Sequence, residues 1–412
     1  MSLIRSLEKH RDIYLLNLIL LTVYFASFAL LNIHINRTTL FFSHDSITYL
    51  NVTHWIQGVS NTMDSQIRPF LYPAILLVLY EGIGSVGLWF FQFLCWIISI
   101  NFIFLSIKHL SKRSCFGFLG SSVATLNFSF LLLTFHALPE VLTTFLLSVY
   151  VFFISTNIKK WRDLEFFHGS LLILVLLVVI KPLFYLMVLF TLLVVLPLFY
   201  LRKYFRKPRK FIVLFLILTP LILQVAIMKI KYDSFTVSEI SGNTFRDYFF
   251  AQGLQHIDHI KYEEAVREAQ HFSASEQVKF ILSHKLLYLT LYAGNLKGNI
   301  DAEPVFLEVP VHYKSLYKFT SNLNTFCFYL HLLFLVPVFF TLATTIIRRE
   351  YDFTFLFFCL SFPLYYILLT SGISFWQGDR LVLPGLPLWI FLYFFVIQYW
   401  RVGLSPFTPQ TG

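Results

Sequence analysis

Charge is scarce in this chain. Only 13% of its 412 residues are Asp, Glu, Lys or Arg, whereas 57% are hydrophobic and 49 are Phe. Soluble domains usually carry about 25% charged residues, because their surface must face water. Together with a mean hydropathy of +0.70, this scarcity excludes an ordinary soluble protein and predicts a polytopic membrane protein.

Cysteine is equally scarce, and the familiar catalytic motifs are absent. The four cysteines fall in or beside apolar runs at unrelated spacings, which excludes a disulfide framework or a zinc pattern. The sequence contains no glycine-rich phosphate loop, GxSxG, HExxH or CxxC. ATP hydrolysis therefore has no support, and no internal repeat or low-complexity segment stands out.

Long apolar runs recur along the chain, each near the ~20 residues that a bilayer requires. They predict an all-α, polytopic membrane helical bundle of about ten spans. The first run is too long for a signal peptide and lacks a small-residue cleavage site, so we expect a retained anchor. The predicted spans are 13–33, 86–107, 115–134, 138–156, 166–182, 183–201, 211–230, 326–347, 353–373 and 381–400.

The net charge of +10 is distributed unevenly between the loops. One alternating set holds 18 of the 32 Lys and Arg but only 6 of the 22 Asp and Glu. Such an excess is typical of cytoplasmic loops, so it predicts cytosolic termini and gives no reason to expect nucleic-acid binding. The basic loops are residues 5–12, 108–113, 159–165, 202–210 and 348–352, with Arg401 in the last tail.

Two long loops, 34–85 and 231–325, are then predicted to face outward. The first should hold one or two amphipathic helices on the membrane surface, followed by an interfacial run over 69–80. The second should form a helical cap, with a charged helix over 261–271 and another beginning near Ser275. The chain thus divides into a membrane module (1–230), a cap loop (231–325) and C-terminal membrane helices (326–412).

Two acidic residues lie where spans are predicted to end on the outer side. Asp45 could simply cap a helix, a role worth about 1 kcal/mol. A capping carboxylate is also fixed in place, as a general base must be. Glu140 follows Pro139 and could complement the positive end of a helix. The alternative is a second active-site acid on the same membrane face as Asp45.

Three cations, Arg68, Lys181 and Arg380, are predicted at the outer boundary of the bilayer. Their structural interpretation is snorkelling to the lipid headgroups. Their functional interpretation is that they hold the phosphate of a lipid-linked substrate, since a guanidinium matches phosphate oxygens.

A divalent metal is possible at His44 and Asp45, with His54 nearby in the sequence. No second carboxylate adjoins Asp45, because Ser46 follows it, and this weakens the metal hypothesis. No other cofactor is predicted.

Taken in order, these pieces resemble the GT-C superfamily of polytopic glycosyltransferases. The resemblance is to the group that includes protein O-mannosyltransferases and aminoarabinose transferases, glycosyltransferase family 39. The matching pieces are Asp45 and Tyr49 in the first outer loop, RPFLYPAILL (68–77), LPE (138–140), Lys181-Pro182 and QGDRLVLPGLPLW (377–389). Many members have a second acid directly after the loop Asp, whereas Ser46 stands there in this chain.

The resemblance implies an inverting sugar transfer at the extracytoplasmic face of a bacterial inner membrane. A polyprenyl-phosphate sugar would enter from the outer leaflet, with its phosphate held by some of Arg68, Lys181 and Arg380. Asp45 would accept the proton of the attacking hydroxyl on a glycolipid, glycan or protein acceptor. Glu140 would orient the acceptor or assist Asp45. Tyr49, Tyr72 and His136 are candidates to position the substrate.

Two other functions stay open. A transporter or flippase of lipid-linked saccharide would need charges within spans and often internal repeats with broken helices, and nearly all charges map to loops or span ends. A glycan polymerase or ligase would differ from the transferase only in its donor.

Overall fold

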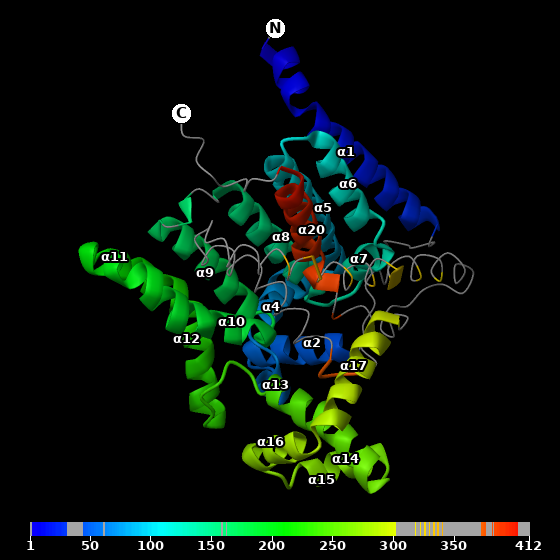
Figure 1. Cartoon of the computed structure of the whole chain (residues 1–412), viewed down its shortest axis with the longest axis vertical. Helices are drawn as coiled ribbons and strands as arrows, with labels where there is room; N and C mark the ends of the chain where they lie inside the picture. The colour runs from blue at the N-terminus through cyan, green and yellow to red at the C-terminus, as the bar shows by residue number, and fades with distance from the viewer. Residues whose placement is uncertain are drawn as a thin grey trace.

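Helices make up the regular structure of the described part of the chain (Figure 1). The computed structural model describes residues 2–30, 44–60, 62–157, 160–161, 163–301, 372–375, 381 and 383–402, with isolated positions between 318 and 340. Over these ranges there are α-helices and short 3-10 and π segments, and no strand. The predicted all-α class is confirmed for the described residues.

Five of the described helical segments are long and apolar enough to cross a membrane. Such segments are what a polytopic membrane protein needs. The predicted ten spans are not confirmed. Predicted spans 326–347 and 353–373 fall almost wholly outside the described residues, span 115–134 is bent, and the helices at 166–182 and 381–400 are shorter than a full span. The five are Arg11–Ala29 within α1 (Ser2–Leu30), α5 (Ser85–Ser111), α8 (Glu140–Asn157), Pro182–Arg206 and α12 (Lys210–Tyr232).

The boundary predicted between the spans 166–182 and 183–201 is present as a helix break at Lys181-Pro182. Before it lies α9 (Leu164–Val178), an apolar helix shorter than a full span. After it, the segment Pro182–Arg206 runs through η4 (Pro182–Phe184), α10 (Tyr185–Phe190), η5 (Thr191–Tyr200) and α11 (Leu201–Arg206). Pro182 suits the first turn of this segment because its missing N–H needs no partner there.

The predicted span over 115–134 is a bent pair of helices. The chain forms α6 (Ser114–Thr125), then α7 (Phe128–Leu132) and η2 (Leu133–Phe135), with a bend of 65° between the two halves. Asn127 causes the break: its side chain accepts a 2.9 Å hydrogen bond from the Phe130 amide and so starts a new helix. Asn is among the strongest N-cap residues, and an apolar run can conceal it.

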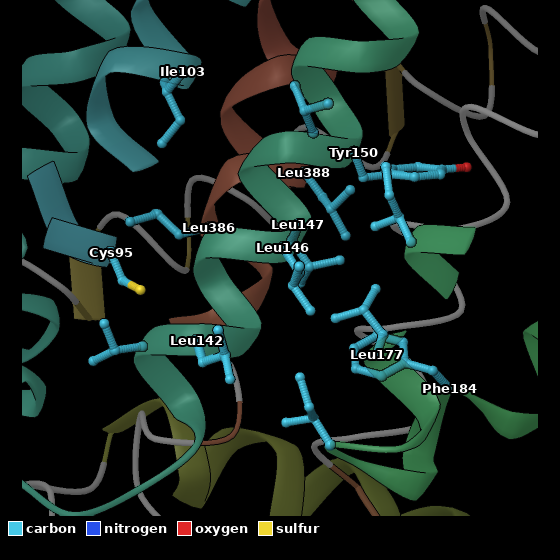
Figure 2. Close-up of a cluster of buried hydrophobic side chains, with 14 of the residues drawn as sticks. Cys95, Ile103, Leu142, Leu146, Leu147, Tyr150, Leu177, Phe184, Leu386 and Leu388 are labelled. Atoms are coloured by element: carbon cyan, nitrogen blue, oxygen red, sulfur yellow. The ribbon is translucent and has the colours of Figure 1, made fainter. Parts of the chain in front are cut away.

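Helix α8 lies at the centre of the apolar core, between α5, α9 and α20 (Leu386–Val402). Figure 2 shows leucines of α8 packed among side chains of these neighbours. The buried hydroxyls of Thr143, Thr144 and Ser148 donate to backbone carbonyls four residues earlier. These three hydroxyls are thereby satisfied by nearby backbone of the same segment, as an apolar surrounding requires.

Gly120 permits the close approach of α6 to α5 and α20. A Cβ there would overlap the side chain of Ile107 and lie 3.1 Å from Ile390 Cγ2 and 3.2 Å from Phe394 Cε2. We expect Gly120→Val to lower the free energy of unfolding by about 1–3 kcal/mol, the usual cost of overpacking. Thermal unfolding of the purified protein in detergent tests this. The control is Gly242→Ala, whose added Cβ would have no neighbour within 4 Å. Equal melting temperatures for Gly120→Val and wild type would contradict the predicted overpacking.

The described part of the predicted cap has a small core of its own. Its elements are α13 (Ile240–Asn243), η6 (Thr244–Phe250), α14 (Ala251–Asp258), α15 (Tyr262–Ala269), α16 (Ala274–Ser283) and α17 (Lys285–Asp301). Phe250, Leu254 and Tyr288 are among its buried residues. In Figure 1 these helices lie at one end of the molecule, while α1 begins and α20 ends at the other.

Two helices of the cap, α15 and α16, are expected from the sequence. Helix α15 lies within the predicted charged helix over 261–271. The helix start expected near Ser275 is displaced, because Ser273 is the N-cap of α16. Ser273 and Glu276 form a reciprocal capping box, in which each side chain bonds to the backbone amide of the other.

The described part of the predicted first outer loop forms α2 (His44–Ile56), α3 (Asp64–Ile67) and α4 (Leu71–Leu76), which continues into η1 (Leu77–Glu81). Hydrogen bonds attach the chain before α13 to this loop. Ser238 Oγ donates to the Ile67 carbonyl at 2.8 Å, and the Glu239 amide donates to the Gln66 carbonyl at 2.9 Å. The cap is therefore fixed directly against the loop that carries Asp45.

Candidate functional site

Asp45 and Arg68, 23 residues apart, form an ion pair within the predicted first outer loop. Arg68 Nη2 lies 2.5 Å from Asp45 Oδ1, and Arg68 Nε donates to Thr48 Oγ1 at 2.9 Å. Asp45 is the second residue of α2, and Arg68 directly follows α3. The carboxylate is thus held from across the loop as well as by its own helix. The 9% exposed Arg68 side chain marks this as a largely desolvated pair.

Two aromatic rings pack beside this ion pair. The Arg68 guanidinium lies over the Tyr49 ring, 4.6 Å from its centroid, a distance at which cation–π attraction operates. Tyr49 in turn packs edge-on against Tyr72, with ring centroids 5.1 Å apart. Both tyrosines are buried. The stack limits the movement of Arg68 and hence of the carboxylate that it holds.

A second ion pair joins two predicted spans. Lys181 Nζ lies 3.2 Å from Glu140 Oε1, although the residues are 41 positions apart. Glu140 opens α8 and is fully buried, whereas the Lys181 side chain is 14% exposed. Lys181 is placed there by the break between α9 and η4, where its extended backbone turns the chain. Burial of an unpaired carboxylate is costly, so each partner depends on the other.

One cavity of about 440 Å³ brings the two ion pairs together. Asp45, Tyr49, Arg68 and Lys181 all line it. Its volume falls within the range of roughly 300–1,000 Å³ that small-molecule sites occupy. Its remaining lining residues are Thr48, Asp64, Ile67, Pro182, Leu183, Ile240, Ser241, Asn243, Thr244, Tyr248, Ile373, Ser374 and Leu381.

Other residues singled out in the sequence lie behind the cavity or outside the described ranges. Glu140 is not among the lining residues, and it contacts the lining residue Lys181. Tyr72 and His136 are fully buried and are not among the lining residues, although Tyr72 lies within electrostatic range of Glu140. Arg380 lies outside the described residues, and its neighbour Leu381 lines the cavity.

Sequence reasoning missed several lining residues. Asp64 is a second carboxylate of the cavity, and it accepts hydrogen bonds from Asn51 (2.8 Å) and Thr62 (3.1 Å). Its position in the same outer loop as Asp45 was a signal that could have been used. Asn243 and Tyr248 come from the cap, nearly 200 residues after Asp45. No sequence motif marks these two residues, because only the tertiary packing of the cap brings them to the cavity.

The metal hypothesis gains no support from the described residues, which contain no cluster of three His, Cys, Asp or Glu able to hold an ion. The side chain of His44 lies outside the description. His54 is nine residues after Asp45 on α2, which separates the two by about 13 Å along the helix axis. It contacts Glu81 instead, at 3.5 Å. His54 therefore cannot share an ion with Asp45.

The geometry permits two kinds of chemistry. Two positioned cations, Arg68 and Lys181, can bind an anionic group that enters the cavity. A fixed carboxylate, Asp45 or Asp64, can accept a proton from a bound hydroxyl. Family models, curated proteins and solved structures offer no match to the chain. The site itself must therefore carry the functional argument.

Proposed function

We propose that this protein is a membrane glycosyltransferase of the GT-C type. It moves a sugar from a polyprenyl-phosphate donor to a glycolipid, glycan or protein acceptor of the cell envelope. The observation that carries the proposal is the single cavity lined by Asp45, Arg68 and Lys181, beneath helical segments of the predicted cap. A base and two cations in one hollow are the groups that displacement of a lipid phosphate requires.

The reaction is a single inverting displacement. The acceptor oxygen bonds to the anomeric carbon of the sugar while the bond from that carbon to the phosphate oxygen breaks. The hydroxyl proton passes to Asp45, and polyprenyl phosphate leaves with the bonding electrons. Phosphate is a stable leaving group, so the step needs no general acid. Positioning, a base and charge stabilisation are sufficient.

The two cations suit the leaving phosphate because each is fixed by its own partners. Asp45, Thr48 and the Tyr49 ring hold Arg68, and Glu140 holds Lys181. Charges positioned before the reaction stabilise a developing anion without reorganisation at the moment of bond breaking. Glu140 then acts by placing Lys181, in addition to any contact that it makes with the acceptor.

The proposed topology has about ten spans in a bacterial inner membrane, with cytosolic termini and an extracytoplasmic active site. The placement of the cap helices at the end opposite the start of α1 supports it. So does the gathering of basic residues in the loops assigned to the cytosol. The donor then reaches the cavity from the outer leaflet, and the cap screens the reaction from bulk water.

Reconstitution tests the activity directly. The purified protein in proteoliposomes is given a radiolabelled polyprenyl-phosphate sugar and a total envelope extract of the producing cells. We expect label in a new glycosidic product at the external face. Labelled lipid that crosses the bilayer without a new glycosidic bond would instead identify a flippase. Mass analysis of the product separates transfer of one sugar from ligation of a whole glycan.

Asp64 is expected to hold a hydroxyl of the donor sugar. The hydrogen bonds that Asp64 accepts from Asn51 and Thr62 orient its carboxylate in the cavity wall. Asp64 would bind substrate, whereas Asp45 would accept the proton. Asp64→Asn should raise the KM for the donor about tenfold and change kcat less, because a bond to a bound hydroxyl is worth roughly 1.5 kcal/mol when one partner is charged. Steady-state transfer kinetics measure this split. A kcat loss as large as that of Asp45→Asn would assign proton transfer to Asp64 instead.

A further inference from the structure

A second cavity of about 550 Å³ lies beside the first. Its walls come from the starts of η4 and α10, from α13 and the chain before it, from η6, and from the α15–α16 connection with the first half of α16. Pro182, Ser241 and Asn243 line both cavities. The two hollows therefore share a wall, and a molecule bound in the second lies next to the first.

The second cavity is rich in uncharged hydrogen-bonding side chains. Hydroxyls and amides both donate and accept, which matches the hydroxyls of a sugar. Tyr185, Phe245 and Phe272 add aromatic surface, against which the C–H groups of a sugar ring can pack. The uncharged polar lining residues are Thr236, Ser238, Ser241, Asn243, Gln270 and Gln277.

The charged groups of this cavity do not favour an anion. Arg246 is held in a two-point contact by Asp247, with Nε–Oδ1 at 2.6 Å and Nη2–Oδ2 at 3.1 Å. These hydrogen bonds raise the pKa of Arg246 and keep it paired. Glu239 adds a negative charge to the lining. With Asp247 beside Arg246 and Glu239 in the lining, the cavity has no net positive charge to attract a phosphate.

We infer that the second cavity binds an uncharged saccharide, the acceptor end onto which the donor sugar is transferred. That the saccharide is the acceptor rests on the proposed function, whereas saccharide binding itself does not. It places the phosphate chemistry and the glycan recognition in adjoining hollows, with Ser241 and Asn243 between them.

Gly242 offers a means of blocking this cavity alone. It lines the second cavity and not the first, and a Cβ added to it would meet no atom within 4 Å. Its φ is not positive, so larger residues fit the backbone of α13. Gly242→Trp should therefore fill the hollow without disturbing the cap, and Gly242→Ala is the matched control that leaves the hollow open.

The test uses the full-length protein in detergent and saturation-transfer NMR. The probe is the pool of free oligosaccharides released by mild acid from the envelope of the producing cells. We expect saturation transfer to the pool from wild type, Gly242→Ala and Asp45→Asn, and at least a fivefold loss with Gly242→Trp. Thermal unfolding reports whether the variant is folded, and Gln270→Leu, at an exposed lining position, repeats the test at a second site.

Two results would overturn the inference. One is the absence of saturation transfer from wild type. The other is undiminished saturation transfer in both folded variants, Gly242→Trp and Gln270→Leu. A loss with Asp45→Asn but not with Gly242→Trp would place the glycan in the first cavity and also reject the inference. If Gly242→Trp blocks saccharide binding but the wild-type protein makes no glycosidic bond, the proposed transferase function is rejected and the saccharide site is retained.

Discussion

Asp45→Asn should abolish sugar transfer and leave a folded, membrane-inserted protein. Asparagine has nearly the shape of aspartate and can still accept a hydrogen bond from Arg68, which Thr48 and Tyr49 also hold. The amide cannot accept the proton of the attacking hydroxyl. Loss of a positioned general base lowers turnover by about 10²- to 10⁴-fold, and we expect this loss in kcat rather than in the KM for the donor.

The measurement is turnover of polyprenyl-phosphate sugar by purified variants in proteoliposomes, with thermal unfolding alongside. Asp233→Asn is the matched control: it removes a carboxylate that is 87% exposed at the end of α12. Residue 233 has a left-handed backbone (φ 53°), which asparagine tolerates as well as aspartate does. Wild-type turnover by Asp45→Asn would end the proposal that Asp45 is the base.

Much of the fold follows from the length of the apolar runs. A run of about 20 apolar residues can satisfy its backbone in a membrane only as a helix, so α5, α8 and α12 could be expected from composition alone. The break at Asn127 could not, because a single capping residue inside an apolar run competes with a strong helical pattern. The start of α16 at Ser273 was within reach, since the Ser-x-x-Glu pattern of a capping box is visible in the sequence.

The pairing of the site residues could not be predicted from the sequence. Charge patterning predicts only that Asp45, Arg68, Glu140 and Lys181 lie on the same side of the membrane. It gave no reason to pair Lys181 with Glu140, since helix packing decides which charges meet. Asn243 and Tyr248 reach the cavity from the cap, which hydrogen bonds to Gln66 and Ile67 attach to the first loop. Contacts of this kind depend on tertiary structure and leave no local signal.

The buried pair of Glu140 and Lys181 allows the structural and functional interpretations of Lys181 to be separated. Lys181→Met should strongly destabilise the protein, because it leaves the fully buried Glu140 carboxylate without its cation. Removing one partner of a buried ion pair costs about 3–5 kcal/mol. The double variant Lys181→Met, Glu140→Gln removes the isolated charge as well. Its stability should therefore return close to that of wild type.

Binding of polyprenyl phosphate should not return in the double variant. If Lys181 holds the phosphate, its loss weakens binding whether or not Glu140 is charged, and we expect about a tenfold rise in Kd in both the single and the double variant. Thermal unfolding and polyprenyl-phosphate titration of the same four proteins, including Glu140→Gln alone, complete the cycle. Wild-type affinity in the double variant would show that Lys181 serves only to neutralise Glu140. Its placement in the cavity wall would then be structural, and Arg68 would be left as the phosphate ligand among the described residues.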